Sequence, residues 1–234
     1  MGSELTSADQ SPQSPLSLRS PQDSRRPHGP DAAFIRRYRP QDAEAVADIC
    51  VRTADAGQDA TGLYRDESVL ADLFALPYVT LDPDLAFVLD DGTGRAVGYV
   101  LGTDDTRRFA ERFRDEWLPL VADRHEPDPG DPSQGPDELM AWLLHHPERL
   151  DVPGLEAYPA HMHIDLLPSH QRRGHGGRLL EALLRELTAR SDVARMHVGM
   201  LTSNKPARAF YDRKGFHRIP IDDPALTYLG ITFN

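Results

Sequence analysis

The sequence predicts an α/β domain with one mixed central sheet of about seven strands flanked by helices. Short apolar runs with strand character alternate with segments of helical periodicity along most of the chain. The length of 234 residues is sufficient for one substantial core. A glycine-rich turn joins a late strand to a helix, which is the arrangement of an anion-binding cradle. Together these observations favour a single domain of this class.

The domain is expected to span residues 33–234, behind a disordered tail at 1–32. The tail is rich in Ser, Pro, Gln and Asp and contains few large apolar side chains. Such a segment cannot bury enough apolar surface to offset the entropy lost on ordering.

The first half of the domain is predicted as strand, helix, helix and hairpin. Pro40 stops the first strand, and the residues at 90–94 have the composition of a hairpin turn. The expected elements are a strand at 34–39, a helix from 41, a second helix from 68, and strands at 85–89 and 96–101.

The segment 103–160 predicts a helical insertion before the fourth strand. It contains a helix with Phe109, Phe113 and Trp117, an acidic loop at 126–136 and a helix near 137–146. Because long loops in compact domains are often functional, we expect the insertion to wall the substrate side. The expected later elements are a strand at 161–167, a helix after the glycine-rich turn, a strand at 195–201, a helix at 206–214 and a final pair of short strands.

Composition excludes several classes of protein. The net charge of −11 and the pI near 5.3 argue against nucleic-acid binding, which needs excess basic charge. No apolar stretch is long enough to span a membrane and no signal peptide is evident, so we expect a cytoplasmic protein without membrane contact. The only cysteine, Cys50, is expected in the core. No metal-ligand spacing occurs, and the adjacent His145 and His146 do not share a helix face.

The residues at 171–180 form the anion cradle predicted above. Gly174, Gly176 and Gly177 would allow a ligand to approach the main chain, and first-turn N–H groups of the following helix point outward. A diphosphate could bind there, with Arg172, Arg173 and Arg178 supplying positive charge. The alternative is a glycine turn that only connects a strand to a helix.

The element order and three motifs resemble the GNAT superfamily of acetyl-CoA-dependent N-acetyltransferases. The motifs lie at 166–176, 204–207 and 210–216, and their order and spacing are more specific than any one of them. The resemblance implies the GNAT fold, whose sheet is splayed between the strands at 161–167 and 195–201, with acetyl-CoA in the opening. There the backbone of Ile164 and Leu166 should pair with the pantetheine arm. The expected cofactor-binding residues are Ile164, Leu166, Gln171, Arg172, Arg173, Gly174, His175, Gly176, Gly177, Arg178, Asn204 and Tyr211.

A closer resemblance links residues 49–64 and 77–81 to the acetyltransferase-like C-terminal domain of animal O-GlcNAcase. The likeness extends to 163–165 and to Phe210-Tyr211. That domain is regarded as a pseudo-acetyltransferase without the glycine-rich cofactor signature. The present chain retains the signature, which favours cofactor binding.

Strand alternation places His161, His163 and Asp165 on one face, where titratable side chains are unusual for a central strand. Asp165 is our first candidate for the general base, His163 the second and His161 the third. The alternative is a satisfied buried network. Many GNAT enzymes carry a Glu on this strand, and none occurs here. Tyr211 resembles the family tyrosine that protonates the leaving thiolate, and Asn204 resembles the family asparagine that bonds the pantetheine or caps its helix.

The acceptor side is predicted from acidic and aromatic residues that would hold a cationic amine, with Asp59 alternatively bracing a local turn. The candidates are Asp55, Asp59, Tyr64 and Tyr78. The predicted function is acetyl transfer from acetyl-CoA to a small-molecule or peptide amine, and a homodimer stays open. A silent acetyl-CoA-binding or protein-interaction module is the main alternative. A Rossmann-type nucleotide site is disfavoured by the glycine spacing.

Overall fold

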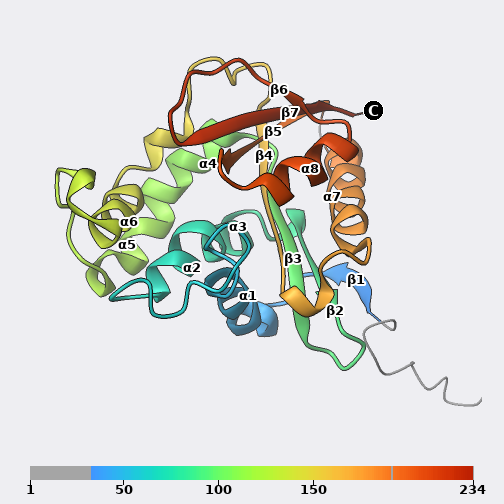
Figure 1. The fold of residues 1–234 in the computed structure, drawn as a ribbon, viewed down its shortest axis with the longest axis horizontal. Coiled ribbons are helices and arrows are strands. Elements are labelled where there is room, and N and C mark those ends of the chain that lie inside the picture. Colours follow the sequence, from blue (N-terminus) through green and yellow to red (C-terminus); the bar gives the residue numbers. More distant parts are fainter. Residues whose placement is uncertain (1–32, 191, 234) are drawn as a thin grey trace, which may run out of the picture.

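The computed structural model describes residues 33–190 and 192–233, so the tail predicted at 1–32 lies outside the described residues. The strands are β1 (Phe34–Arg37), β2 (Ala86–Asp90), β3 (Ala96–Thr103), β4 (Ala160–Leu166), β5 (Arg195–Leu201), β6 (His217–Arg218) and β7 (Leu226–Thr232). They form one seven-stranded sheet in the order β1-β2-β3-β4-β5-β7-β6 (Figure 1). Only β4 and β5 pair in parallel; the other pairs are antiparallel. This mixed sheet confirms the predicted fold class.

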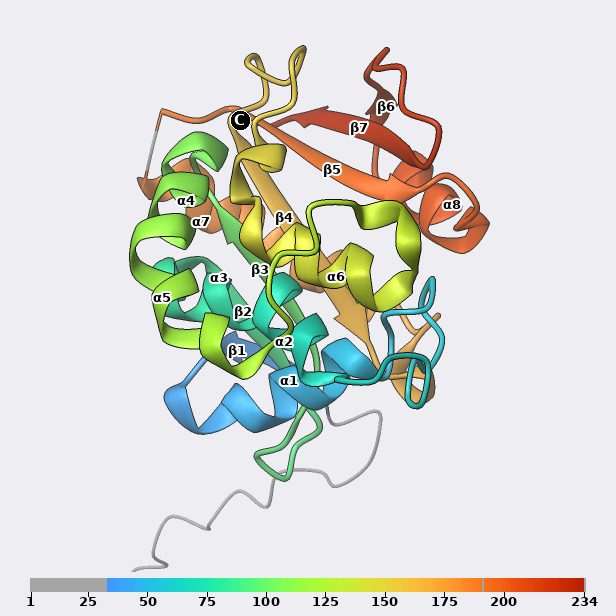
Figure 2. The same ribbon diagram turned by 90° about the vertical axis from the view of Figure 1, so that its left-hand side faces the viewer.

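Helices cover both faces of the sheet. They are α1 (Ala43–Val51), α2 (Ser68–Phe74), α3 (Leu76–Leu81), α4 (Thr106–Arg112), α5 (Leu118–Val121), α6 (Pro136–His145), α7 (His175–Arg190) and α8 (Lys205–Arg213). Figure 2 shows α1 to α6 in front of the sheet and α7 behind it. Every residue of β2 and β3 is buried, because α7 packs against both strands from behind while α1 packs against β3 from the front.

The sheet opens between β4 and β5. β4 pairs with β3 from His161 to Leu166, but it pairs with β5 only at Ala160 and His161. β5 in turn pairs with β7 along its whole length. The segment 162–166 therefore has no strand partner on its β5 side, which confirms the predicted splay.

The leucine face of α7 anchors this helix on the sheet, as its 3.6-residue periodicity predicts. Leu179, Leu180, Leu183 and Leu187 are buried, whereas Leu184 is only half-buried. A Cβ on Gly102 of β3 would lie 3.1 Å from the Leu183 methyl groups, so glycine there lets helix and sheet approach closely. The N-terminus of α7 is thereby held at the open end of β4.

Local periodicity misplaced some boundaries. The helix expected from residue 68 is confirmed as α2, but the sequence did not predict the separate helix α3 that follows it, with Pro77 in its first turn. The helix expected around Phe113 contains a π-helical segment at Phe113–Trp117. The final strands are unequal, since β6 has two residues and β7 has seven.

Candidate active site

The turn between β4 and α7 has the backbone of an anion nest. After a 3-10 turn at Pro168–His170, Arg172 and Gly174 adopt φ angles of +58° and +81°, with Arg173 between them. Alternation of left-handed and right-handed residues makes successive N–H groups converge into a concavity that suits an anion. A positive φ is costly for a residue other than glycine, so Arg172 holds strained backbone at this position.

The three glycines of this turn have different roles. A Cβ on Gly174 would meet no atom within 4 Å, so the space beside it is open. A Cβ on Gly176 would lie 3.3 Å from the Phe210 ring, and one on Gly177 would lie 2.5 Å from Lys214 Nζ. Gly176 therefore allows close packing against Phe210 of α8, whereas the atoms nearest Gly177 belong to the end of a flexible lysine side chain. The expectation that all three glycines expose backbone to a ligand stays a prediction.

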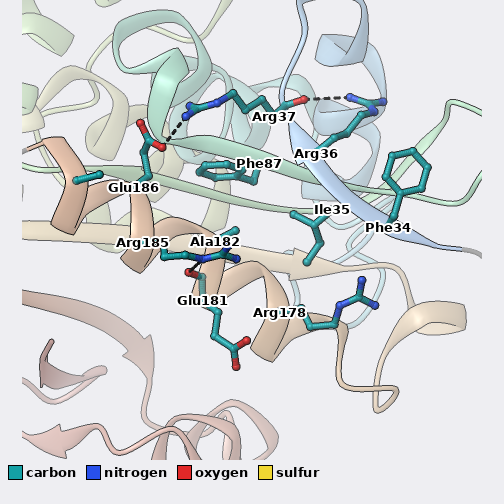
Figure 3. A pocket seen from close by; sticks show the side chains of 11 residues that line it. Phe34, Ile35, Arg36, Arg37, Phe87, Arg178, Glu181, Ala182, Arg185 and Glu186 are labelled. Atoms are coloured by element: carbon teal, nitrogen blue, oxygen red, sulfur yellow. Dashed lines mark hydrogen bonds and ion pairs between the residues drawn. The ribbon is translucent and has the colours of Figure 1, made fainter. Parts of the chain in front are cut away.

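The basic side chains near the turn point in different directions. Arg172 and Arg173 are exposed beside the nest. Arg178 instead lines a groove of about 760 Å³ between α7 and β1, together with Arg185 and Glu186 (Figure 3). β1 lies three strands from β4, so this groove is remote from the titratable face of β4. Arg178 nevertheless lies in the first turn of α7, where its N–H donates to the Gly174 carbonyl at 3.3 Å, and its role as a diphosphate-binding charge stays a prediction.

The edge of β4 that faces β5 presents unpaired backbone. Leu167 N–H donates to the Val97 carbonyl at 3.0 Å, so by alternation Ile164 and Leu166 direct their N–H and C=O groups toward β5. Gln171 Nε2 donates to the Leu166 carbonyl at 2.8 Å and to the Gly57 carbonyl at 3.5 Å. Gln171 therefore braces the end of β4, and its amide is engaged within the protein.

The Asp165 side chain is half-buried on the face of β4 that lies toward α1. Its Oδ2 accepts a hydrogen bond from Tyr99 Oη at 2.8 Å. Burial raises the pKa of Asp165 to about 6, although the hydrogen bonds from Tyr99 and Thr53 oppose this shift. Burial also raises the pKa of the neighbouring Cys50 thiol to about 12, so Cys50 is a core residue as predicted.

His163 lines a cavity of about 160 Å³ on the same face as Asp165. Its ring packs against Tyr78 and Phe74, with centroids 5.1 and 5.8 Å away. Burial lowers the pKa of His163 to about 4, with a further contribution from the charge of Arg149. The imidazole is therefore neutral near pH 7. The cavity is lined by Leu73, Phe74, Tyr78, Phe113, Pro147, Arg149, Leu150, Val152, His161, Met162, His163, His197, Gly199, Leu226 and Tyr228.

His161 is held by hydrogen bonds at both ring nitrogens. Thr106 Oγ1 has one proton, which it donates to the Pro159 carbonyl at 2.7 Å, so His161 Nδ1 must donate to Thr106 Oγ1. Nε2 then accepts from the Tyr78 hydroxyl at 2.7 Å. Burial lowers the pKa of His161 well below its usual value, which keeps the ring neutral. Tyr78 and His161 thus form a buried pair in which each polar group has a hydrogen-bond partner. The proton of the Tyr78 hydroxyl is engaged by His161 and is not free to bind an acetyl acceptor.

Tyr211 and Asn204 are contributed by α8. Tyr211 is buried against Phe210 and Phe216, and burial, with a further contribution from Asp165, raises its pKa. Its phenol is therefore protonated at neutral pH and can donate a proton. Asn204 Oδ1 accepts from Ala207 N–H at 3.0 Å, which confirms the predicted helix cap.

The other acceptor-side candidates lie outside the cavity. Asp59 is exposed and accepts hydrogen bonds from the N–H and hydroxyl of Thr61, so its carboxylate braces its own turn. Asp55 forms an isolated bridge with Gln58. Tyr64 is half-buried, and its pKa is raised by burial and then by Asp55. These residues form a neighbouring loop and do not line the cavity.

Comparison with known proteins identifies the family. A family model described as "FR47-like protein" matches residues 132–223. The solved structure of SsHAT is 56% identical to this chain with a TM-score of 0.82, and the match covers 86% of this chain and 98% of SsHAT. The chain belongs to the GNAT superfamily of acetyltransferases.

Two more distant solved structures are also similar to this chain, and the first of them shares its fold. PH1933 from Pyrococcus horikoshii OT3 is 13% identical with a TM-score of 0.54, and the match covers 86% of this chain and 99% of PH1933. The putative acetyltransferase yncA from Salmonella typhimurium, solved with its cofactor acetyl-CoA, is 15% identical with a TM-score of 0.49. That match covers 86% of this chain and 94% of yncA.

Two residues of the cavity in this GNAT protein were missed from the sequence. His197 on β5 donates from Nδ1 to the Tyr158 carbonyl at 2.7 Å, which leaves Nε2 as an acceptor. A histidine within an otherwise apolar strand is the sequence feature that could have identified His197. Arg149 comes from the 3-10 turn Pro147–Leu150 of the insertion. No local pattern marks it, because the contact depends on how the insertion folds back. Residues of the insertion line the cavity, and its expected place on the substrate side stays a prediction.

The described residues add two negative findings. Within 33–190 and 192–233, no group of three or more His, Cys, Asp or Glu side chains is arranged so that it could hold a metal ion. No helix in these same ranges is long and apolar enough to cross a membrane.

Proposed function

We propose that this protein is an acetyl-CoA-dependent N-acetyltransferase that acts by direct attack of an amine on the thioester. One observation carries the proposal: the unpaired edge of β4 runs directly into the anion nest that opens α7. An extended arm with amide groups fits the strand edge, and a diphosphate fits the nest. Both features occur together in the CoA thioesters.

Several residues of this chain would hold the cofactor. Ile164 would pair its N–H and C=O groups with the pantetheine amides, and so would the Leu166 N–H. The nest at Arg172 and Gly174 would bind the diphosphate through main-chain N–H groups, with the helix dipole of α7 adding to the attraction. Asn204 stays a candidate for a pantetheine contact beside its capping role. Acetyl-CoA would supply the activated acetyl group.

The reaction requires two proton transfers. As the amine nitrogen bonds to the acetyl carbon and the carbon–sulfur bond breaks, the amine loses a proton and the thiolate gains one. Asp165 is the proposed base because a pKa of about 6 leaves it ionised at neutral pH yet still basic. His163 is the second candidate. Tyr211 is the proposed acid, because its raised pKa keeps its proton available.

A calorimetric titration with acetyl-CoA tests cofactor binding. Gly174→Asp places a carboxylate and a strained backbone in the nest and is expected to weaken binding at least about tenfold. Gly130→Asp is the matched control, because Gly130 also has a positive φ, +71°, and no atom within 4 Å of an added Cβ. Equal affinity in all three proteins, or no binding to the unsubstituted chain, would defeat the proposal.

A catalytically silent acetyl-CoA-binding module is the second candidate. It is favoured by the hydrogen bond that Asp165 already receives from Tyr99, and by the absence of Asp165 from the lining of the cavity. Thiol release from acetyl-CoA in the presence of an amine panel separates the two functions. Binding without release for any amine would support the silent module, whereas release that depends on Tyr211 would support the enzyme.

A further inference from the structure

The cavity beside His163 contains one permanent charge. Among its lining side chains only Arg149 is always ionised, and none is a carboxylate. His161, His163 and His197 have pKa values lowered by burial, so these rings are neutral near pH 7. The cavity is therefore positive although the whole chain has a net charge of −11.

Arg149 has an incomplete set of partners. Its Nε donates to the Leu143 carbonyl at 3.1 Å, which fixes the plane of the guanidinium. In the ranges 33–190 and 192–233, its terminal nitrogens have no hydrogen-bond partner and no carboxylate within 4.0 Å. The adjacent Glu148 is exposed and accepts instead from His146 Nδ1 at 2.8 Å. Both terminal nitrogens of the planar fork reach water and are thus left for another group.

The Arg149 side chain is half-buried, so its guanidinium is only partly withdrawn from water. Burial lowers the pKa of Arg149, and the weaker influences of Tyr78, Tyr228 and Glu148 oppose this shift only in part. Removing a cation from water without a counter-ion is unfavourable. Arg149 and His163 line the same cavity, and the charge of Arg149 contributes to the lowered pKa of His163.

We propose that Arg149 binds a carboxylate of the acceptor, so that the acceptor class is amino acids and related small amino carboxylates. This inference rests on the proposed acetyltransferase function. A guanidinium fork matches a carboxylate with two parallel hydrogen bonds. One arginine balances one negative charge, whereas a phosphate carries more. The cavity of about 160 Å³ is of a size for the compact end of such a molecule.

The test compares acceptors that differ only in the carboxylate. Standard L-amino acids and their C-terminal amides are supplied with acetyl-CoA, and kcat/KM is measured from thiol release. Free acids are expected to be preferred at least about tenfold, the effect of a charge-assisted hydrogen bond. Arg149→Met should abolish the preference and Arg149→Lys should restore part of it. Arg107→Met is the control, because Arg107 is exposed and pairs with Asp151 at 3.2 Å.

Several outcomes would overturn the inference. One is an equal kcat/KM for the amides and the free acids. Another is a preference for the free acids that is unchanged in Arg149→Met. If O-phosphoethanolamine is a better acceptor than β-alanine, the group that Arg149 binds is a phosphate and not a carboxylate. Thermal unfolding checks that Arg149→Met is folded.

Failure of the underlying function gives a different result. If acetyl-CoA does not bind, the proposed function fails, and binding of the amino acids themselves still decides the role of Arg149. If acetyl-CoA binds without turnover, calorimetry with the N-acetyl amino acids takes the place of kinetics. Binding that is lost in Arg149→Met supports the carboxylate site, and no binding to the parent protein overturns it.

Discussion

Asp165 and His163 lie two residues apart on β4, and burial shifts their pKa values in opposite directions. Loss of water disfavours the charged form of each group, which is the anion of Asp165 and the cation of His163. The pKa of Asp165 rises to about 6 and that of His163 falls to about 4. At neutral pH Asp165 is therefore the stronger base, although His163 lies closer to the cavity.

The pH dependence of turnover separates these two candidates. If Asp165 is the base, kcat/KM falls as the pH drops through about 6, because the carboxylate becomes protonated and can no longer accept a proton. Asp165→Asn is expected to remove this limb and to lower kcat/KM by about 10²–10⁴-fold. Asp59→Asn, at an exposed turn, is the control. If kcat/KM of Asp165→Asn still falls as the pH drops through about 6, the group that titrates there is not Asp165.

At the scale of elements, a buried ion cluster joins three parts of the fold. Arg36 on β1 bonds Asp42 at the start of α1 at 2.6 Å and Asp90 at the end of β2 at 2.8 Å. The three side chains are 9%, 4% and 3% exposed, so water cannot replace a lost partner. Removal of one carboxylate would leave Arg36 incompletely paired in the interior.

Stability is expected to depend on this cluster in acid. The hydrogen bonds from Arg36 help to hold the pKa values of Asp42 and Asp90 below the usual value, against the effect of burial. The stabilisation is therefore present above the unfolded pKa, about 4, and is lost as the pH falls through the lower folded values. Urea unfolding at neutral pH should show a loss of about 3–5 kcal/mol for Asp42→Asn. Asp115→Asn should change stability by less than about 1 kcal/mol, because its pair with Arg114 is exposed. Equal losses would contradict a role for the cluster.

Element order was largely predictable, whereas some contacts between elements were not. Period-two alternation correctly placed His161, His163 and Asp165 on one face of β4, and leucine periodicity correctly placed α7. The partners of these residues lie far away in the chain. His161 bonds Tyr78, 83 residues earlier, and local patterns contain no information about such a pairing.

For the whole molecule, the splayed sheet leaves backbone groups of β4 that a bound cofactor would pair with. β4 and β5 are held together at one end by Ala160 and His161 and diverge toward the other, where the nest opens α7. Backbone groups that a continuous sheet would satisfy are left for a ligand or for water. A bound acetyl-CoA should therefore stabilise the molecule and protect this edge.

Thermal unfolding and hydrogen exchange measure both effects. Acetyl-CoA at about 100 times its Kd should add about 2.7 kcal/mol, because it binds only the folded state. Amides of Ile164 and Leu166 should exchange more slowly in its presence. ADP is the control ligand, since it has a diphosphate without pantetheine and should protect only the turn at 171–178. Unchanged exchange along β4 with bound acetyl-CoA would refute the pseudo-strand arrangement.

The sequence by itself determined the fold class, the turn at the start of α7, the polar face of β4 and the resemblance to the family to which the chain belongs. These are local properties, carried by periodicity, turn residues and short motifs. Only the tertiary structure decided that Gly176 packs closely against Phe210, that the Tyr78 hydroxyl is hydrogen-bonded to His161, and that Arg149 lines the cavity beside His163. The physical reason is that packing joins segments tens of residues apart, and burial then sets which charges find partners.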